Sequence, residues 1–207
     1  MVRGFTNSLV IGVFASALIL TVCTLAGWIV VHGTGRARHV LDVLTSVPVA
    51  IPNIVVGICL LWVYFVVPVN IRGTHLILVL AYFTLFVALA ARVINARLLQ
   101  MDKELVEAAQ MCGASYLTTM RTIVAPLILP ALASLSLYIV AASFKELETT
   151  TLLSSPQTKT ASVVLFDSVG GATMSQTAAI GVVSILTLLV VLLGWQVLAR
   201  KFNIQGF

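Results

Sequence analysis

The stretch from Glu104 to Pro126, ELVEAAQMCGASYLTTMRTIVAP, has the clearest potential for chemistry in this sequence. It is polar and helix-prone, whereas the segments on either side of it are almost free of charge. A carboxylate such as that of Glu107 can accept a charge-assisted hydrogen bond from an Arg or Lys of another protein. The chain has no GxxxxGK[ST] phosphate loop, so we expect it neither to bind nor to hydrolyse ATP, and we do not expect it to be an enzyme.

The local pattern predicts that this stretch forms two short helices joined near Gly113. One helical face would gather Leu105, Ala108, Ala109, Cys112 and Tyr116. Asp102 can cap the first helix, Gly113 can take the left-handed conformation that ends it, and Ser115 can cap the second helix. Because the polar face is acidic and the apolar face includes two alanines, the hairpin suits close contact with a cytoplasmic protein better than contact with lipid headgroups.

The composition places the hairpin in a membrane protein. Of the 207 residues, 60% are hydrophobic and 9% are charged, against roughly 25% charged in an average soluble domain. A soluble chain could not cover its surface with so few charges. The net charge is +5, but the basic residues are spread along the chain without interleaved aromatic residues, which indicates membrane orientation and argues against nucleic-acid binding.

We predict an all-α integral membrane protein with one domain, residues 1–207, and five spans. About 20 apolar residues cross the hydrocarbon core as a helix. The apolar runs place the spans near residues 9–31, 47–69, 74–96, 122–144 and 178–199, with a cytoplasmic loop at 100–121. Pro48 and Pro52 interrupt the second span, and Pro126 and Pro130 the fourth, either as packing kinks or as parts of a moving pathway.

The basic residues predict the orientation. Eight would lie on the cytoplasmic side with the hairpin: Arg36, Arg38, Arg92, Arg97, Lys103, Arg121, Arg200 and Lys201. Four would lie outside: Arg3, Arg72, Lys145 and Lys159. This excess favours a cytoplasmic hairpin. It also places the N-terminus outside, which we would explain by an absent leading helix or by a longer polypeptide of which this is one part.

No metal or cofactor site is expected. The three cysteines, Cys23, Cys59 and Cys112, fall in different segments without a CxxC spacing, which indicates reduced thiols acting as small apolar groups. The histidines, His32, His39 and His75, lie near predicted segment ends and form no ligand cluster in the sequence.

The hairpin resembles the EAA loop of bacterial ABC importer permeases. That pattern is EAA, three residues, Gly, nine residues, then I-x-L-P. The residues that match it are Glu107, Ala108, Ala109, Gly113, Ile123 and Pro126, and Ala125 stands where the pattern has Leu. The resemblance extends over nearly the whole chain, because SVPVAIPNIVVGICLLW is similar to the Pro- and Gly-bearing second core helix of these permeases.

A second segment, FKELETTTLLSSPQTKTASVVLFDSV, resembles the iron(III)-type branch of the family, in which a KELPATLLL-like run is typical. Lys145, Glu146 and Leu147 match that run, whereas Glu148 replaces its Pro. Ser154 and Ser155 stand near the place where an Arg-Pro pair often lies.

The resemblance implies a five-transmembrane-helix permease core in a bacterial inner membrane, with a cytoplasmic EAA coupling-helix hairpin. It implies three protein partners besides membrane lipid: a cytoplasmic ABC ATPase dimer that Glu107 contacts, a second permease half that is identical or homologous, and an external solute-binding protein. Ferric iron is the first expectation for the substrate. Polyamine, phosphonate, sulfate and thiamine remain alternatives, because permeases for these solutes share the core.

The charged residues Lys145, Glu146 and Glu148 leave two interpretations open. They are candidates for the translocation path or for contact with the binding protein. Alternatively, Lys145 and Glu148 are three residues apart and can form an ion pair at a helix end.

Two other functions compete with the importer. A secondary transporter would be expected to carry acidic residues at mid-span or inverted repeats, neither of which is visible in the sequence. A membrane scaffold that recruits another cytoplasmic protein is disfavoured by the EAA spacing.

Overall fold

The computed structural model describes residues 2–33, 35–66, 71, 73–171 and 174–201, and within these ranges it is helical with connecting turns and loops. The helices are α1 (Val2–His32), α2 (Arg36–Ser46), the 3₁₀ helix η1 (Val47–Ala50), α3 (Asn53–Val66), α4 (His75–Leu99), α5 (Lys103–Met111), α6 (Tyr116–Thr119), the π-helical turn η2 (Met120–Val124), α7 (Ala125–Ser143), α8 (Glu148–Leu153), α9 (Ala161–Gly171) and α10 (Met174–Lys201). The all-α prediction is confirmed.

Four of these helical segments are long and apolar enough to cross a membrane. They are Val2–His32, His75–Leu99, Met120–Ser143 and Met174–Val197. They coincide with four of the five predicted spans, although the first helix begins at Val2 rather than near residue 9. Helix α1 starts earlier than predicted because its first two turns contain no proline and only one charged residue, Arg3.

The second predicted span, 47–69, is not one straight helix. The segments Arg36–Ala50 and Asn53–Val66 meet at an angle of 110°. Ile51 is extended (φ −99°, ψ 124°) between them, because a proline disfavours the helical conformation in the residue before it and Pro52 follows. The bent pair forms either a broken span or a re-entrant loop, so the count of five spans stays a prediction. Residues 67–69 lie outside the described ranges.

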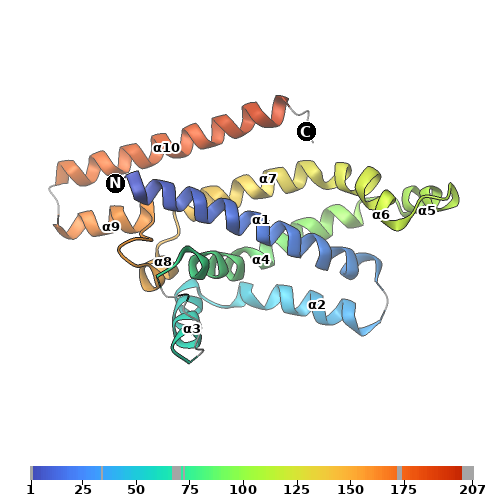
Figure 1. Cartoon of the computed structure of the whole chain (residues 1–207), viewed down its shortest axis with the longest axis horizontal. Helices are drawn as coiled ribbons and strands as arrows, with labels where there is room; N and C mark the ends of the chain where they lie inside the picture. Colours follow the sequence, from blue (N-terminus) through green and yellow to red (C-terminus); the bar gives the residue numbers. More distant parts are fainter. Residues whose placement is uncertain (1, 34, 67–70, 72, 172–173, 202–207) are drawn as a thin grey trace.

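Helix α1 lies at the centre of the helix packing, against α4 and α7 (Figure 1). Its buried face carries mostly small residues: Gly4, Ser8, Ile11, Gly12, Ala15, Ser16, Ile19, Cys23, Gly27 and Val30. A methyl group added at Gly12 would overlap Ser143 Oγ and lie 3.2 Å from Val140 Cα. One added at Gly27 would lie 3.3 Å from Ile94 Cγ2. Small residues at such positions let membrane helices pack closely, where dispersion contacts are strongest.

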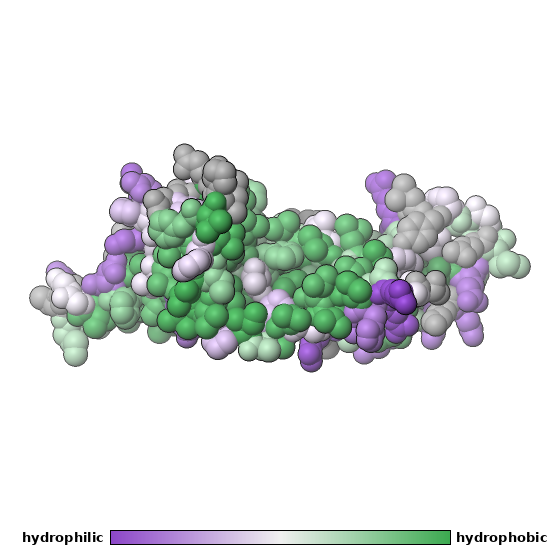
Figure 2. Space-filling view, turned by 90° about the horizontal axis from the view of Figure 1, so that it is seen from below, coloured by the Kyte–Doolittle hydropathy of each residue, from purple (hydrophilic) through white to green (hydrophobic). Residues whose placement is uncertain are grey.

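The surface is divided along the long axis of the molecule. Figure 2 shows apolar residues over most of the middle of the molecule and hydrophilic residues gathered toward the two ends. A band of this kind suits a hydrocarbon layer between two aqueous faces.

The α1–α7 contact makes a prediction about stability. Gly12→Val should destabilise the folded chain by about 1–3 kcal/mol, because its side chain would overpack against α7. We expect thermal unfolding in detergent to occur several degrees lower than in the unaltered chain. Gly194→Val is the matched control, because Gly194 lies on a membrane helix with no heavy atom near its added methyl group. Equal melting temperatures for the two variants would contradict the packing argument.

Candidate functional site

The first helix of the hairpin ends at Gly113, as predicted. The Cys112 amide donates to the Ala108 carbonyl at 3.0 Å, and the Ala114 amide donates to the Ala109 carbonyl at 3.0 Å. Gly113 lies between them at φ +79°, in the left-handed region. These bonds form the helix end in which a glycine reverses the chain and satisfies carbonyls of the last turn.

The second helix begins at Ser115, again as predicted. The Thr118 amide donates to Ser115 Oγ at 3.3 Å, and the Thr119 amide donates to the Ser115 carbonyl at 3.0 Å. At the start of the first helix, the Leu105 amide donates to the Asp102 carbonyl at 3.1 Å. The side-chain cap predicted for Asp102 stays a prediction.

The hairpin continues into α7 without a loop, through the π-helical turn η2. The Ala125 amide donates to the carbonyl of Met120, five residues back, rather than to that of Arg121. The wider turn comes just before Pro126, whose ring would clash with the carbonyl four residues back in a regular helix. Pro126 is exposed, Ile123 is half-buried and Val124 is fully buried. The hairpin is therefore joined to a membrane-spanning helix by continuous backbone.

The predicted contact face of α5 is not covered by its own chain. Glu107 and Ala108 are exposed, Leu105 is 46% exposed, and Ala109 is half-buried. Val106, on another side of the helix, packs against the core. Figure 1 shows α5 at the end of the molecule that is remote from α8 and α9. The face that carries Glu107 is thus open to another molecule.

At the other end of the molecule, Glu146 is buried and bonded within the chain. Its Oε1 accepts a hydrogen bond from the Thr149 amide at 3.1 Å, and its Oε2 accepts one from Thr150 Oγ1 at 3.4 Å. Its carbonyl accepts a bond from Ser162 Oγ at 2.5 Å. Glu146 therefore holds the start of α8 and fixes α9 to it.

Among the described residues, the ion pair considered between Lys145 and Glu148 is absent. Both side chains are exposed, and the salt bridge found within the described residues joins Lys159 Nζ to Asp167 Oδ2, at 2.5 Å. The reason is that α7 ends at Ser143 and α8 begins at Glu148. Lys145 and Glu148 therefore do not share a helix, and a spacing of three residues does not bring them together.

Sequence reasoning missed a buried polar cluster beside Glu146. Tyr82 Oη lies 2.9 Å from Thr150 Oγ1 and donates to the Ser143 carbonyl at 3.2 Å. Ser143 Oγ donates to the Ser8 carbonyl at 3.2 Å, and Ser8 Oγ accepts from the Ala161 amide at 2.9 Å. Tyr82 and Ser143 lie within apolar runs, where a single hydroxyl gives no signal in the sequence. The cluster joins α1, α4, α7, α8 and the start of α9.

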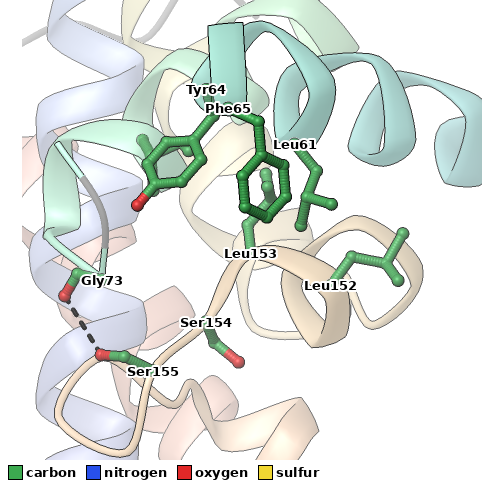
Figure 3. Close-up of a pocket in the computed structure, with 9 residues that line it drawn as sticks. Leu61, Tyr64, Phe65, Gly73, Leu152, Leu153, Ser154 and Ser155 are labelled. Carbon is green, nitrogen blue, oxygen red and sulfur yellow. Dashed lines mark hydrogen bonds between the residues drawn. The ribbon is translucent and has the colours of Figure 1, made fainter. Parts of the chain in front are cut away.

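A pocket of about 170 Å³ lies between α3, α4 and α8. The rings of Tyr64 and Phe65 stand on one side of it and Leu152 and Leu153 on another, and Ser155 Oγ donates to the Gly73 carbonyl at 3.1 Å (Figure 3). Across the described residues, no three His, Cys, Asp or Glu side chains are grouped as metal ligands.

The comparisons with known proteins agree with this architecture. Residues 20–203 match the model of the family described as "Binding-protein-dependent transport system inner membrane component". The chain is 27% identical to the Fe(3+)-transport system permease protein FbpB 2 of Haemophilus influenzae, over 79% of this chain and 32% of that protein. It is 29% identical to the putrescine transport system permease protein PotI of Escherichia coli K12, over 78% of this chain and 59% of that protein. The chain thus spans less than two thirds of the length of either relative.

The fold is also that of a solved transporter chain. The chain superimposes on a chain of the MetNI methionine ABC transporter, in an inward-facing conformation, with a TM-score of 0.77 at 15% identity. The match covers 97% of this chain and 95% of that chain. The family model covers most of the sequence and the structure has the fold of such proteins, so the chain belongs to the family of inner membrane components of binding-protein-dependent transport systems.

Proposed function

We propose that this chain is the membrane-spanning permease subunit, or one half of it, of an ATP-driven ABC importer. The observation that carries the proposal is the uncovered face of α5, with Glu107 and Ala108 exposed on a hairpin that runs directly into α7. Family membership supports it. ATP hydrolysis belongs to a separate ATPase subunit in this proposal.

The hairpin would couple the ATPase to the membrane helices. A short helix presenting small residues can enter a cleft on a partner, and Glu107 can bond there to an Arg or Lys. Two ATPases that close on ATP would move two permease halves between inward- and outward-facing states. Such a shift requires contacts that differ between the two states. The bonded Gly113 turn keeps α5 in a fixed direction relative to α6, and the partner can therefore push on α7 through it.

The opposite end of the molecule would meet the external binding protein. Lys145 and Glu148 are exposed there and are available for that contact or for the translocation path. Glu146 is buried and bonded to α8, so it would act by holding this surface in place.

Ferric iron is the substrate that we propose first. The support is the Lys145–Leu147 match to the iron(III)-type run and the similarity to a permease named for Fe(3+) transport. Similarity to a permease named for putrescine keeps polyamine as an alternative, with phosphonate, sulfate and thiamine. Selection of the solute would rest with the external binding protein.

The docking role of Glu107 is tested by co-purification with the ATPase subunit. Glu107→Lys should lower the recovery of the ATPase, with affinity reduced at least about tenfold because a charge-assisted bond becomes a repulsion. Glu104→Lys is the matched control, with the same charge change one turn earlier on an exposed position of α5. Equal recovery with the unaltered chain and with Glu107→Lys would contradict the coupling role.

The turn at Gly113 is tested by a pair of substitutions. Gly113→Ala forces a side chain into the left-handed conformation, at a cost of about 1–2 kcal/mol, and should reduce substrate-stimulated ATP hydrolysis by the reconstituted transporter. Gly113→Asn should retain most of that hydrolysis, because asparagine tolerates this conformation. If both variants lost activity equally, or neither lost any, the direction set by this turn would not matter for coupling.

The substrate is tested by uptake into proteoliposomes that contain the transporter, with its binding protein outside and ATP inside. We expect ATP-dependent accumulation of radioactive ferric iron and no accumulation of putrescine, 2-aminoethylphosphonate, sulfate or thiamine. Uptake of one of these four solutes without iron would reassign the substrate and leave the importer function standing. Uptake that needed no ATP would favour a secondary transporter instead.

A further inference from the structure

A groove of about 400 Å³ opens between α1, α2 and α4, apart from the pocket near α8 and from the contact face of α5. Its charged lining residues are Arg38 and Asp42 on α2 and Arg92 on α4. Its apolar walls include Val31 and Leu99. In Figure 1 the end of α1 and the start of α2 lie toward the same end of the molecule as α5 and α6.

Within the described part of the chain, the charged groups of the groove form no ion pair. Arg38, Asp42 and Arg92 are exposed, and none of them takes part in an ion pair among the described residues. Arg38 and Asp42 are four residues apart, so both stand on one side of α2. Two guanidinium groups and one carboxylate therefore border one cavity.

Helix α2 begins at the hairpin end of the molecule and runs beside α1 and α4 toward its middle (Figure 1). It has no buried residue. Exposed apolar side chains, Val40, Val43 and Leu44, alternate along it with the exposed Arg38 and Asp42. Its first turn, which carries Arg38, therefore lies toward the end where hydrophilic residues gather, and its later turns lie toward the apolar middle (Figure 2). The groove thus combines apolar walls with a charged rim, toward the end of the molecule where the hairpin lies.

We propose that this groove binds the headgroup of a phosphatidylethanolamine molecule in the leaflet on the hairpin side. Arg38 and Arg92 bond the phosphodiester, because guanidinium groups bind phosphate oxygens in a bidentate manner. Asp42 accepts a hydrogen bond from the ammonium group, and the apolar walls cover the start of the acyl chains. Basic pockets between membrane helices on the cytoplasmic side are known to hold lipid headgroups. Asp42 gives this pocket its preference for a lipid that also carries an amine.

This assignment does not depend on the solute or on coupling to an ATPase. It concerns a lipid held by α1, α2 and α4, and it predicts that the bent segment after α2 is anchored at its start. A bound headgroup would cross-link α2 to α4 at a place where the two helices make no charge pair of their own.

The test is native mass spectrometry of the purified full chain in detergent, after equilibration with equal amounts of dioleoyl phosphatidylethanolamine and dioleoyl phosphatidylglycerol. The unaltered chain should retain mainly phosphatidylethanolamine. The double variant Arg38→Gln/Arg92→Gln should retain about tenfold less of it, because charge-assisted bonds to the phosphate are lost. The matched control Arg36→Gln/Arg121→Gln removes two exposed basic residues that do not line the groove and should retain as much as the unaltered chain.

Two further arms separate the headgroup from other sources of phosphate. Asp42→Asn should keep total phospholipid retention but lose the preference for phosphatidylethanolamine over phosphatidylglycerol. Soluble glycerophosphoethanolamine, added at the concentration of the lipid, should not displace it, because the apolar walls contact the acyl chains. Unchanged retention by Arg38→Gln/Arg92→Gln, equal loss in the control, a preference for phosphatidylglycerol in the unaltered chain, or ready displacement by the soluble compound would each overturn the assignment.

Discussion

The close approach of α4, α7 and α9 to one face of α1 is the constraint on which the rest of this structure depends. Small residues recur there at intervals of three or four, as at Gly4, Ser8 and Gly12. In lipid the hydrophobic effect does not drive helices together, so dispersion contacts and interhelical hydrogen bonds must do so, and both act over short distances. A larger side chain at Gly4 or Gly12 would separate helices that also share hydrogen bonds.

The polar cluster near α8 exists because of that close approach. Ser8 lies on the small-residue face, and its carbonyl and hydroxyl both accept bonds from other segments, from Ser143 and from the Ala161 amide. Tyr82 reaches Thr150 in the same cluster, and Thr150 in turn bonds to Glu146. A buried polar group is costly unless it is partnered, and here the partners come from several helices. The result is one connected unit at the end of the molecule remote from α5.

The local features of the hairpin and the positions of four long helices follow directly from the sequence. A glycine that ends one helix and a serine that begins the next depend only on neighbouring residues. An apolar run long enough to span a membrane is likewise visible within one continuous stretch of sequence. Gly113, Ser115 and the four long helices therefore lie where the pattern predicts. The five-span count, the docking role of Glu107 and the substrate remain predictions, because they concern the bilayer and other molecules.

Features that depend on contacts between helices could not be predicted from the sequence. Pro48 and Pro52 indicated an interruption, but the 110° turn between the helices on either side depends on what α3 packs against, which is α8 and α4. The burial of Glu146 could not be predicted, because its partners belong to α8, which folds back after α7 ends. The pairing of Lys145 with Glu148 was wrong for the same reason: a helical spacing applies only where one helix includes both residues.

The two ends of α7 connect the hairpin to the polar cluster. The helix has 19 residues and is thus about 28 Å long. It begins just after η2 and ends at Ser143, which bonds to Ser8 of α1. A force applied to α5 therefore reaches α1 through α7, and the close packing at Gly12 leaves little room for α7 to slide on α1.

If the hairpin moves, α1, α4 and α7 should move together as one body. The change in shape would then occur at the break between η1 and α3, where η1 has no buried residue, and along α10, whose apolar window has none either.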